Sequence, residues 1–185
     1  MIESKDMTKN NELQLHGERP EVITVTPSIW NGLRSDILKI EHESFSSSLA
    51  DSEKDLRKLV DSPTGIFLAL SLPPSYGVIG YIAADLLETF SNIPGATDDP
   101  HFGKRDTIYV ASVAVLPNWR GRGFGTALMR ECLKVASQKG IERVTAHIET
   151  GSVTRTGLAV KVLNSFRDWY GTGRTFDYVE IVMEA

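Results

Sequence analysis

Residues 108–125 constrain the fold of this chain more than any other segment. Residues 108–116, IYVASVAVL, form a continuous apolar run with the length of a buried strand. Residues 120–125, RGRGFG, follow with three glycines and two arginines, and a stretch with apolar side chains at helical spacing comes directly after them. A turn that only reverses the chain needs fewer glycines and no positive charge. The segment therefore predicts a strand, a loop and a helix arranged to bind an anion.

The physical basis of that prediction is the exposed start of the helix. The first N–H groups of a helix have no partner within it and carry a partial positive charge. Gly121, Gly123 and Gly125 remove the Cβ atoms that would keep an anion away from these groups. Arg120 and Arg122 can add charge. A pyrophosphate is the expected occupant.

Two other kinds of glycine loop fit this sequence less well. A dinucleotide-binding loop has the spacing G-x-G-x-x-G after a first strand, whereas residues 121–125 read G-x-G-x-G and lie two-thirds along the chain. A P-loop requires Gly-Lys-Ser/Thr, which the sequence lacks. The remaining alternative is a strand-to-helix turn that is rich in glycine for steric reasons alone.

The bulk properties predict one globular domain. The chain has 185 residues, and we expect residues 1–20 to be a solvated tail and residues 21–185 to be a single domain. The net charge of −4 disfavours a general nucleic-acid partner, and no apolar run is long enough to span a membrane. The single cysteine, Cys132, allows no intramolecular disulfide, and the tail has no apolar signal segment, so we expect a cytoplasmic protein.

The apolar patterns predict a mixed α/β fold, in which a central sheet is flanked by helices, with the order β-α-α-β-β-β-α-β-α-β. Residues 88–107 interrupt this order as a loop of about 20 residues, a length that is usually functional or disordered. The expected strands are residues 21–27, 65–72, 77–87, 108–116, 141–149 and 178–185, and the expected helices are residues 28–45, 51–63, 124–139 and 154–170.

Residues 109–129, YVASVAVLPNWRGRGFGTALM, resemble the central acetyl-CoA motif of the GNAT superfamily of N-acetyltransferases. That motif is Arg/Gln-x-x-Gly-x-Gly/Ala, which Arg120, Gly123 and Gly125 match. It follows an Ala-Val-x-Pro strand end, matched by residues 114–117, and precedes a helix with a leucine at the place of Leu128.

The resemblance implies a twisted mixed sheet whose strand 108–116 splays away from the next parallel strand, residues 144–149. Acetyl-CoA would be the co-substrate, with its thioester in the cleft and no metal involved. The pantetheine arm would then lie against the strand end, and the pyrophosphate against the loop. The residues placed at these two sites are Val113, Ala114, Val115, Arg120, Gly121, Arg122, Gly123, Phe124, Gly125 and Thr126.

Acetyl transfer requires that the acceptor amine lose a proton. Some family members use a glutamate at the position that Tyr109 occupies here, so a simple carboxylate base is not implied. Glu149 is the nearest carboxylate in the sequence pattern and could act through water, or it could be a solvated strand-end residue. His147 could be a base or a packing histidine.

The leaving thiolate needs a proton, which many family members supply from a tyrosine on the last helix. Tyr170 is our candidate, although the surrounding family pattern is not kept, and Tyr170 could instead pack beside Trp169. Cys132 lies on the apolar stripe of its helix, so we interpret it as a core residue rather than a nucleophile.

The acceptor is expected to be a small-molecule or peptide amine held by the first two helices and the loop at residues 88–107. Acidic side chains and histidines there would favour a cationic acceptor such as a polyamine, an aminosugar or a lysine side chain. They are Glu41, His42, Glu43, Asp98, Asp99 and His101. A homodimer is common in the family. The alternatives are a catalytically silent acetyl-CoA sensor and a transferase for a longer acyl group.

Overall fold

The computed structural model describes residues 20–72, 77–152 and 158–182. The predicted tail, except for its last residue, and the turn between the second and third strands lie outside them. The helices are α1 (Trp30–Ser44), α2 (Glu53–Asp61) and α3 (Phe124–Gln138). The strands are β1 (Glu21–Thr24), β2 (Ile66–Leu72), β3 (Gly77–Leu86), β4 (Thr107–Val115), β5 (Arg143–Glu149), β6 (Val160–Phe166) and β7 (Phe176–Ile181).

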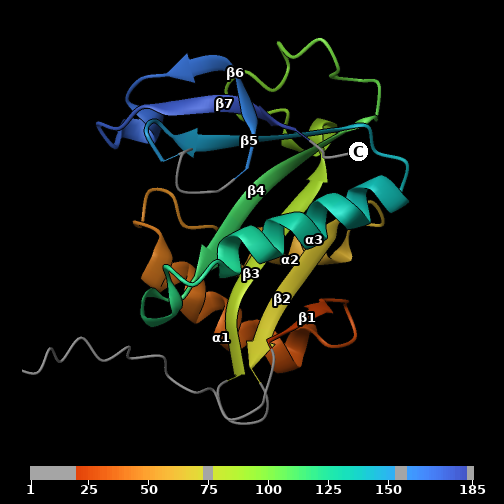
Figure 1. The fold of residues 1–185 in the computed structure, drawn as a ribbon, viewed down its shortest axis with the longest axis vertical. Coiled ribbons are helices and arrows are strands. Elements are labelled where there is room, and N and C mark those ends of the chain that lie inside the picture. Colours follow the sequence, from red (N-terminus) through yellow and green to blue (C-terminus); the bar gives the residue numbers. More distant parts are fainter. Residues whose placement is uncertain (1–19, 73–76, 153–157, 183–185) are drawn as a thin grey trace, which may run out of the picture.

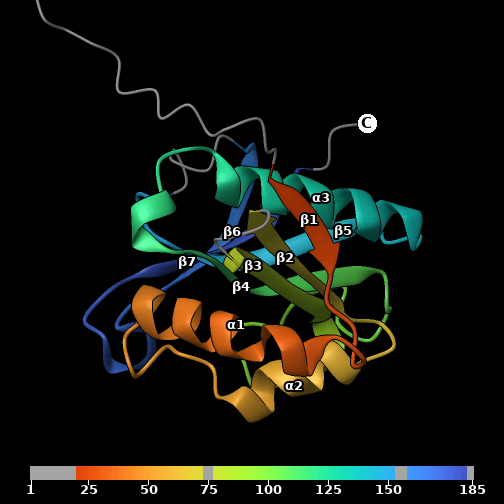
Figure 2. The same cartoon turned by 90° about the horizontal axis from the view of Figure 1, so that it is seen from below.

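These strands form one sheet in the order β1-β2-β3-β4-β5-β7-β6. Neighbours are antiparallel except for β4 and β5, which are parallel and are connected through α3. Helices α1 and α2 cover one face of the sheet and α3 covers the other (Figures 1 and 2). The predicted mixed α/β fold is confirmed.

Alternation along the central strands explains the two layers. Leu68 and Leu70 of β2 belong to the core beneath α3, whereas Phe67 and Ala69 belong to the core beneath α1 and α2. Successive side chains of a strand point to opposite faces, so a strand that is apolar throughout can fill both cores. Cys132 of α3 is fully buried in the first of these cores, and burial raises the pKa of its thiol to about 12. Its predicted core position is confirmed.

The predicted helix at residues 154–170 is wrong. Residues 160–166 form β6, which pairs with β7 from Val160 opposite Ile181 to Phe166 opposite Phe176. Apolar side chains at Leu158, Val162 and Phe166 are spaced by four and imitate a helical stripe. The ladder with β7 decides in favour of a strand, so the described elements follow the order β-α-α-β-β-β-α-β-β-β. Residues 153–157 lie outside the described part of the chain.

The connection between β3 and β4 is an ordered cover rather than an open loop. Its Asp99 accepts two hydrogen bonds of 2.9 Å from the Arg143 guanidinium and one of 2.7 Å from the Tyr178 hydroxyl. Glu88 accepts the backbone N–H groups of Gly103 and Arg105 at 2.8 and 2.9 Å. These bonds fix the connection over β5 and β7. No helix in the described residues is long and apolar enough to cross a membrane.

Candidate active site

The central feature of the site is the place where β4 and β5 separate. Their parallel ladder joins only Thr107–Val110 to residues 143–146. Beyond this point β4 pairs only with β3, and β5 only with β7. Ala111 is a bulge, because Ala83 pairs with Ser112 while Ala84 pairs with Val110. A bulge increases the local twist of a strand, which turns the end of β4 away from β5.

The separation opens a cleft of about 890 Å³. Its floor and sides are residues 109–115 of β4 and residues 146–149 of β5. Most of the remaining wall comes from the segment after α1, residues 55–59 of α2, the segment after β3 and the connection between β6 and β7. The sequence resemblance predicted a cleft between these two strands, and the register of the sheet agrees with it.

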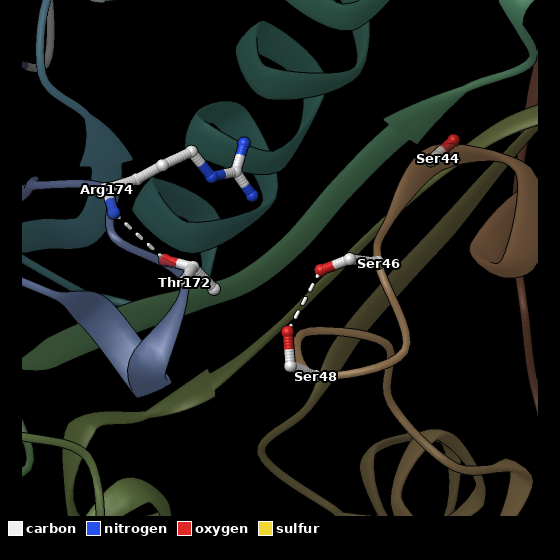
Figure 3. A pocket seen from close by; sticks show the side chains of 5 residues that line it. All are labelled: Ser44, Ser46, Ser48, Thr172 and Arg174. Carbon is white, nitrogen blue, oxygen red and sulfur yellow. Dashed lines mark hydrogen bonds between the residues drawn. The ribbon is translucent and has the colours of Figure 1, made fainter.

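The cleft opens between the segment after α1 and the connection from β6 to β7 (Figure 3). A polar pocket of about 490 Å³ lies at this mouth. Ser44 and Ser48 on one side and Arg174 on the other line both the mouth and the cleft. The Arg174 side chain extends from the β6–β7 side toward the serine side (Figure 3).

The glycine loop lies at the end of β4 and opens α3. Gly121 and Gly123 have φ values of +75° and +80°, a conformation that favours glycine. Gly125 lies inside the first turn of α3 with no positive φ, and a Cβ there would meet nothing within 4 Å. Neither backbone conformation nor packing within the protein requires glycine at this position. The conformation of the turn therefore accounts for Gly121 and Gly123 but not for Gly125.

The predicted coenzyme-binding residues fall into two groups in the structure. Val113, Ala114 and Val115 line the cleft along with Arg120. Residues 121–126 lie beyond the cleft at the N-terminus of α3. Gly123 is the N-cap and offers no side chain to the first N–H groups of the helix. The cleft-lining group and the group at the start of α3 follow one another along the chain. A long nucleotide with a pantetheine arm could therefore contact both.

The two arginines of the loop already have partners. Arg120 donates through Nε to the carbonyl of Val115 at 2.8 Å and through a terminal nitrogen to the Ser44 hydroxyl at 3.0 Å. It therefore ties the end of β4 to the end of α1. The Arg122 guanidinium lies 4.9 Å from the ring centroid of Trp119, a cation–π contact at the surface.

Tyr109 and His147 meet at the base of the cleft. The Tyr109 hydroxyl lies 3.0 Å from Nδ1 of His147. The imidazole stacks between Trp169 and Tyr178, with centroid distances of 4.2 and 4.9 Å. Burial lowers the pKa of His147 to about 4 and raises the pKa of Tyr109, so both side chains are neutral at pH 7. Nε2 of His147 is buried and has no partner among the described residues.

Glu149 lies in the cleft wall at the end of β5. One of its carboxylate oxygens is 3.2 Å from the Arg174 guanidinium. The negative charge of Glu149 is therefore matched by a neighbouring cation, which leaves it less available to attract a second one.

Tyr170 is in the cleft wall but not on a helix, in contrast to the prediction. It lies in a short 3₁₀ turn (Trp169–Gly171) between β6 and β7, with φ and ψ of 49° and 35°. Its ring is half exposed and meets the Trp169 ring edge-on at 4.8 Å. Partial burial raises the pKa of its hydroxyl, which stays protonated at neutral pH and can donate a proton.

The predicted acceptor-binding acids are not in the cleft wall, which contains none of those six residues. Glu41 is fully buried and accepts hydrogen bonds from the Tyr81 hydroxyl and the backbone N–H of Asp51. Asp99 is buried against Arg143. These two carboxylates hold the fold together and do not face an acceptor, so the prediction is wrong for them.

Sequence reasoning missed Asp51, Ser112 and Arg174, which the fold brings to the cleft. The Ser112 hydroxyl donates to the Asp51 carboxylate at 3.0 Å, across 61 positions of sequence. Asp51 precedes the N-cap Ser52 of α2, and only this position at a helix start marks it in the sequence. No local pattern indicates that the segment faces β4.

The sequence of this chain matches a known protein family. The acetyltransferase (GNAT) family matches residues 30–163, which is most of the chain. The chain belongs to the GNAT family. It is thus an acetyltransferase by family, and acetyl-CoA-dependent N-acetyl transfer is the general function of that family. A sequence search among curated proteins found no significant match.

Solved structures share the GNAT fold at low sequence identity. The ribosomal-protein-S18-alanine N-acetyltransferase of Escherichia coli has a TM-score of 0.64 at 11% identity, over 90% of this chain and 96% of that one. Arabidopsis thaliana NAA60 in complex with acetyl-CoA has a TM-score of 0.64 at 15% identity, over 89% and 99%. Arabidopsis thaliana Naa50 with the bisubstrate analogue CoA-Ac-MVNAL has a TM-score of 0.62 at 13% identity, over 87% and 97%.

Proposed function

We propose that this GNAT protein transfers the acetyl group of acetyl-CoA to a primary amine by direct attack of the amine on the thioester. The observation that carries the proposal is the cleft between β4 and β5. It has the glycine loop at one end of β4 and a group of polar side chains, Asp51, Tyr109 and Tyr170, in its walls. A nucleotide and an amine can therefore approach one thioester from different sides.

The coenzyme would be held by β4 and the loop that follows it. The diphosphate would rest on the first N–H groups of α3, where Gly125 leaves the approach open. The pantetheine arm would run beside residues 113–115, whose strand edge has no neighbouring strand on the cleft side. Strand edges offer N–H and C=O groups that suit the amides of such an arm.

The amine would be positioned by Tyr109. If the Tyr109 hydroxyl donates to neutral His147, the phenol oxygen keeps lone pairs that can accept an N–H of the amine. This contact would aim the nitrogen lone pair at the carbonyl carbon. Water beside Glu149 would take up the proton that the amine releases.

The chemical step then forms a C–N bond and breaks the C–S bond. The amine nitrogen attacks the carbonyl carbon, and the tetrahedral intermediate expels the thiolate of coenzyme A. Tyr170 would give its hydroxyl proton to this sulfur and recover one from solvent. The products are an N-acetylated amine and coenzyme A with a free thiol, so the sum of atoms and charge is balanced.

Peptide amines belong among the acceptors to be tested. Two of the similar structures carry names that specify a ribosomal protein or a peptide-based bisubstrate analogue. An α-amine has a pKa near 8, about two units below that of a lysine side chain, so it gives up its proton more readily. A cleft whose histidine has a pKa of about 4 contains no strong base and suits such an amine better.

The proposal is tested by thiol release from acetyl-CoA in the presence of a panel of amines. The panel should include peptides with free N-termini, a polyamine and an aminosugar, with calorimetry to measure acetyl-CoA binding separately. Release with at least one amine is the expected result. Binding of acetyl-CoA without thiol release would favour a catalytically silent sensor. Thiol release from a longer acyl-CoA but not from acetyl-CoA would favour a transferase for a longer acyl group.

A further inference from the structure

Asp51 has an unusual charge environment within the cleft. Three carboxylates line the cleft: Asp51, Asp55 and Glu149. Asp55 lies 2.6 Å from the Lys58 ammonium, and Glu149 lies 3.2 Å from the Arg174 guanidinium. Among the described residues, no Lys, Arg or His forms an ion pair with Asp51, whose side chain accepts only the neutral hydroxyl of Ser112.

The position of the Asp51 carboxylate is fixed from two sides. Its backbone N–H donates to buried Glu41 at 2.6 Å, and Glu41 is itself held by the hydroxyl of Tyr81. Its side chain is held by Ser112, which follows the bulge of β4 where the cleft opens. Two buried residues, Glu41 and Ser112, therefore hold the Asp51 carboxylate in a set position in the cleft wall, unlike a loop carboxylate that moves freely in solvent.

The raised pKa of the Asp51 carboxyl agrees with a partly buried carboxylate that has no paired cation among the described residues. Removal from water, with the charge of Asp55 nearby, raises the pKa of the Asp51 carboxyl, and the Ser112 hydrogen bond offsets only part of this effect. A carboxylate in this state is stabilised by an incoming positive charge more than a fully hydrated one is. The other titratable groups of the surrounding cleft wall are Asp55, Lys58, Tyr109, Arg120, His147, Glu149, Tyr170 and Arg174.

We propose that Asp51 binds the ammonium group of the acceptor, so that the cleft selects primary amines that arrive protonated. This inference rests on the proposed acetyl transfer and adds the residue that recognises the acceptor. The apolar side chains Phe45, Leu49 and Phe90 line the same cleft and would cover the carbon skeleton of the acceptor. Before it attacks, the bound ammonium would release one proton to the water beside Glu149 and so become the neutral amine.

Two probe acceptors of similar shape distinguish the effect of the acceptor's positive charge from the effect of its size. Benzylamine is protonated at neutral pH, whereas O-benzylhydroxylamine is uncharged, and both present a primary amine to the thioester. Steady-state kinetics with the full chain would give KM and kcat for each probe, and calorimetry the Kd for acetyl-CoA. Asp51→Asn is expected to raise KM for benzylamine by about tenfold to a hundredfold, the range of a charge-assisted hydrogen bond. The KM for O-benzylhydroxylamine and the Kd for acetyl-CoA should change by less than about twofold.

Glu142→Gln is the matched control, because Glu142 is exposed and lies outside the cleft wall. It should leave both probes unchanged. Ser112→Ala keeps the charge of Asp51 and removes its anchor, so it should raise KM for benzylamine by a few fold and spare the uncharged probe. This second variant decides the question if Asp51→Asn fails to fold.

The outcomes are distinguishable. Absence of thiol release by the wild type with every amine overturns the proposed function and this inference with it. Wild-type release together with equal losses for both probes in Asp51→Asn, or with no loss for either, overturns the role of Asp51 alone.

Discussion

The hydroxyl oxygen of Tyr109 lies 3.0 Å from Nδ1 of His147, just where β4 and β5 part. Both rings are embedded among other aromatic side chains, so the pair cannot move apart without disturbing Phe90, Trp169 and Tyr178. A polar contact held in this way can position a reacting group at low entropic cost.

Removal of the Tyr109 hydroxyl should slow the reaction without weakening coenzyme binding. Tyr109→Phe keeps the ring that packs at 4.8 Å from Phe90. We expect kcat to fall by about a hundredfold, the loss that misplacement of a reacting group by about 1 Å can cause. Steady-state kinetics and acetyl-CoA calorimetry would measure the two quantities. An unchanged kcat would remove Tyr109 from the mechanism.

His147 should make the fold sensitive to acid. Its pKa is about 4 in the folded protein, below the ordinary value of 6.5, so the unfolded chain binds the proton more readily between these values. Stability should therefore decline as the pH falls from 6.5 toward 4, by on the order of 3 kcal/mol from this residue. Urea unfolding of the wild type and His147→Gln at neutral pH and near pH 4.5 would show it.

The control for this loss is His42→Gln, which changes an exposed histidine. The variant of His42 should follow the wild type at both pH values, while the variant of His147 should lose less stability on acidification. Identical acid sensitivity in all three proteins would contradict the argument.

Gly125 offers a test in which binding and stability move in opposite directions. Gly125→Ala should stabilise α3 by about 0.5 to 1 kcal/mol, since alanine is the better helix former and its Cβ meets nothing within 4 Å. If a diphosphate rests on this turn, the same methyl group should weaken acetyl-CoA binding by about tenfold, a cost of about 1.4 kcal/mol.

Gly32 provides the comparison, because it lies in α1 with equally open surroundings and no positive φ. Gly32→Ala should give a similar gain in melting temperature with no change in coenzyme affinity. Equal affinity of both variants for acetyl-CoA would place the nucleotide elsewhere.

Asp99 should act on stability alone. It is buried and holds the connection between β3 and β4 to Arg143 and Tyr178. Asp99→Ala leaves the Arg143 charge without that partner and should cost about 3 kcal/mol or more. Asp98→Ala, one residue earlier and exposed, should cost less than about 0.5 kcal/mol. Denaturant unfolding would compare the two, and similar small losses would show that Asp99 does not anchor the connection.

Tyr170 is the candidate donor to the leaving thiolate. Tyr170→Phe should lower kcat by about tenfold or more and flatten the alkaline limb of the pH–rate profile. The position has a left-handed backbone conformation, so phenylalanine is the proper substitution because it keeps the side chain that the turn already accommodates. An unaltered turnover number would mean that the acid is another group or that none is needed.

The unit from residue 107 to residue 149 could be predicted well, because its signals are local. An apolar strand, glycines at a helix start and an amphipathic helix each depend on neighbours in sequence, and all of them appear at the expected places. The coenzyme-binding residues were predicted by the same local logic, and their role stays a prediction. The helix predicted at residues 154–170 failed because a spacing of four also fits a strand, and only the ladder with β7 distinguishes the two.

The sequence by itself therefore determined the family, the glycine loop and the mixed α/β class, all of which rest on short-range chemistry. The tertiary structure alone decided which polar groups face one another across the cleft. Ser112 meets Asp51 across 61 positions, and His147 meets Tyr109 across 38. Glu41 and Asp99, which the sequence suggested as acceptor contacts, are buried in hydrogen-bond networks in the structure. Such pairings follow from strand register and loop path, which depend on the summed packing of the whole domain rather than on any local pattern.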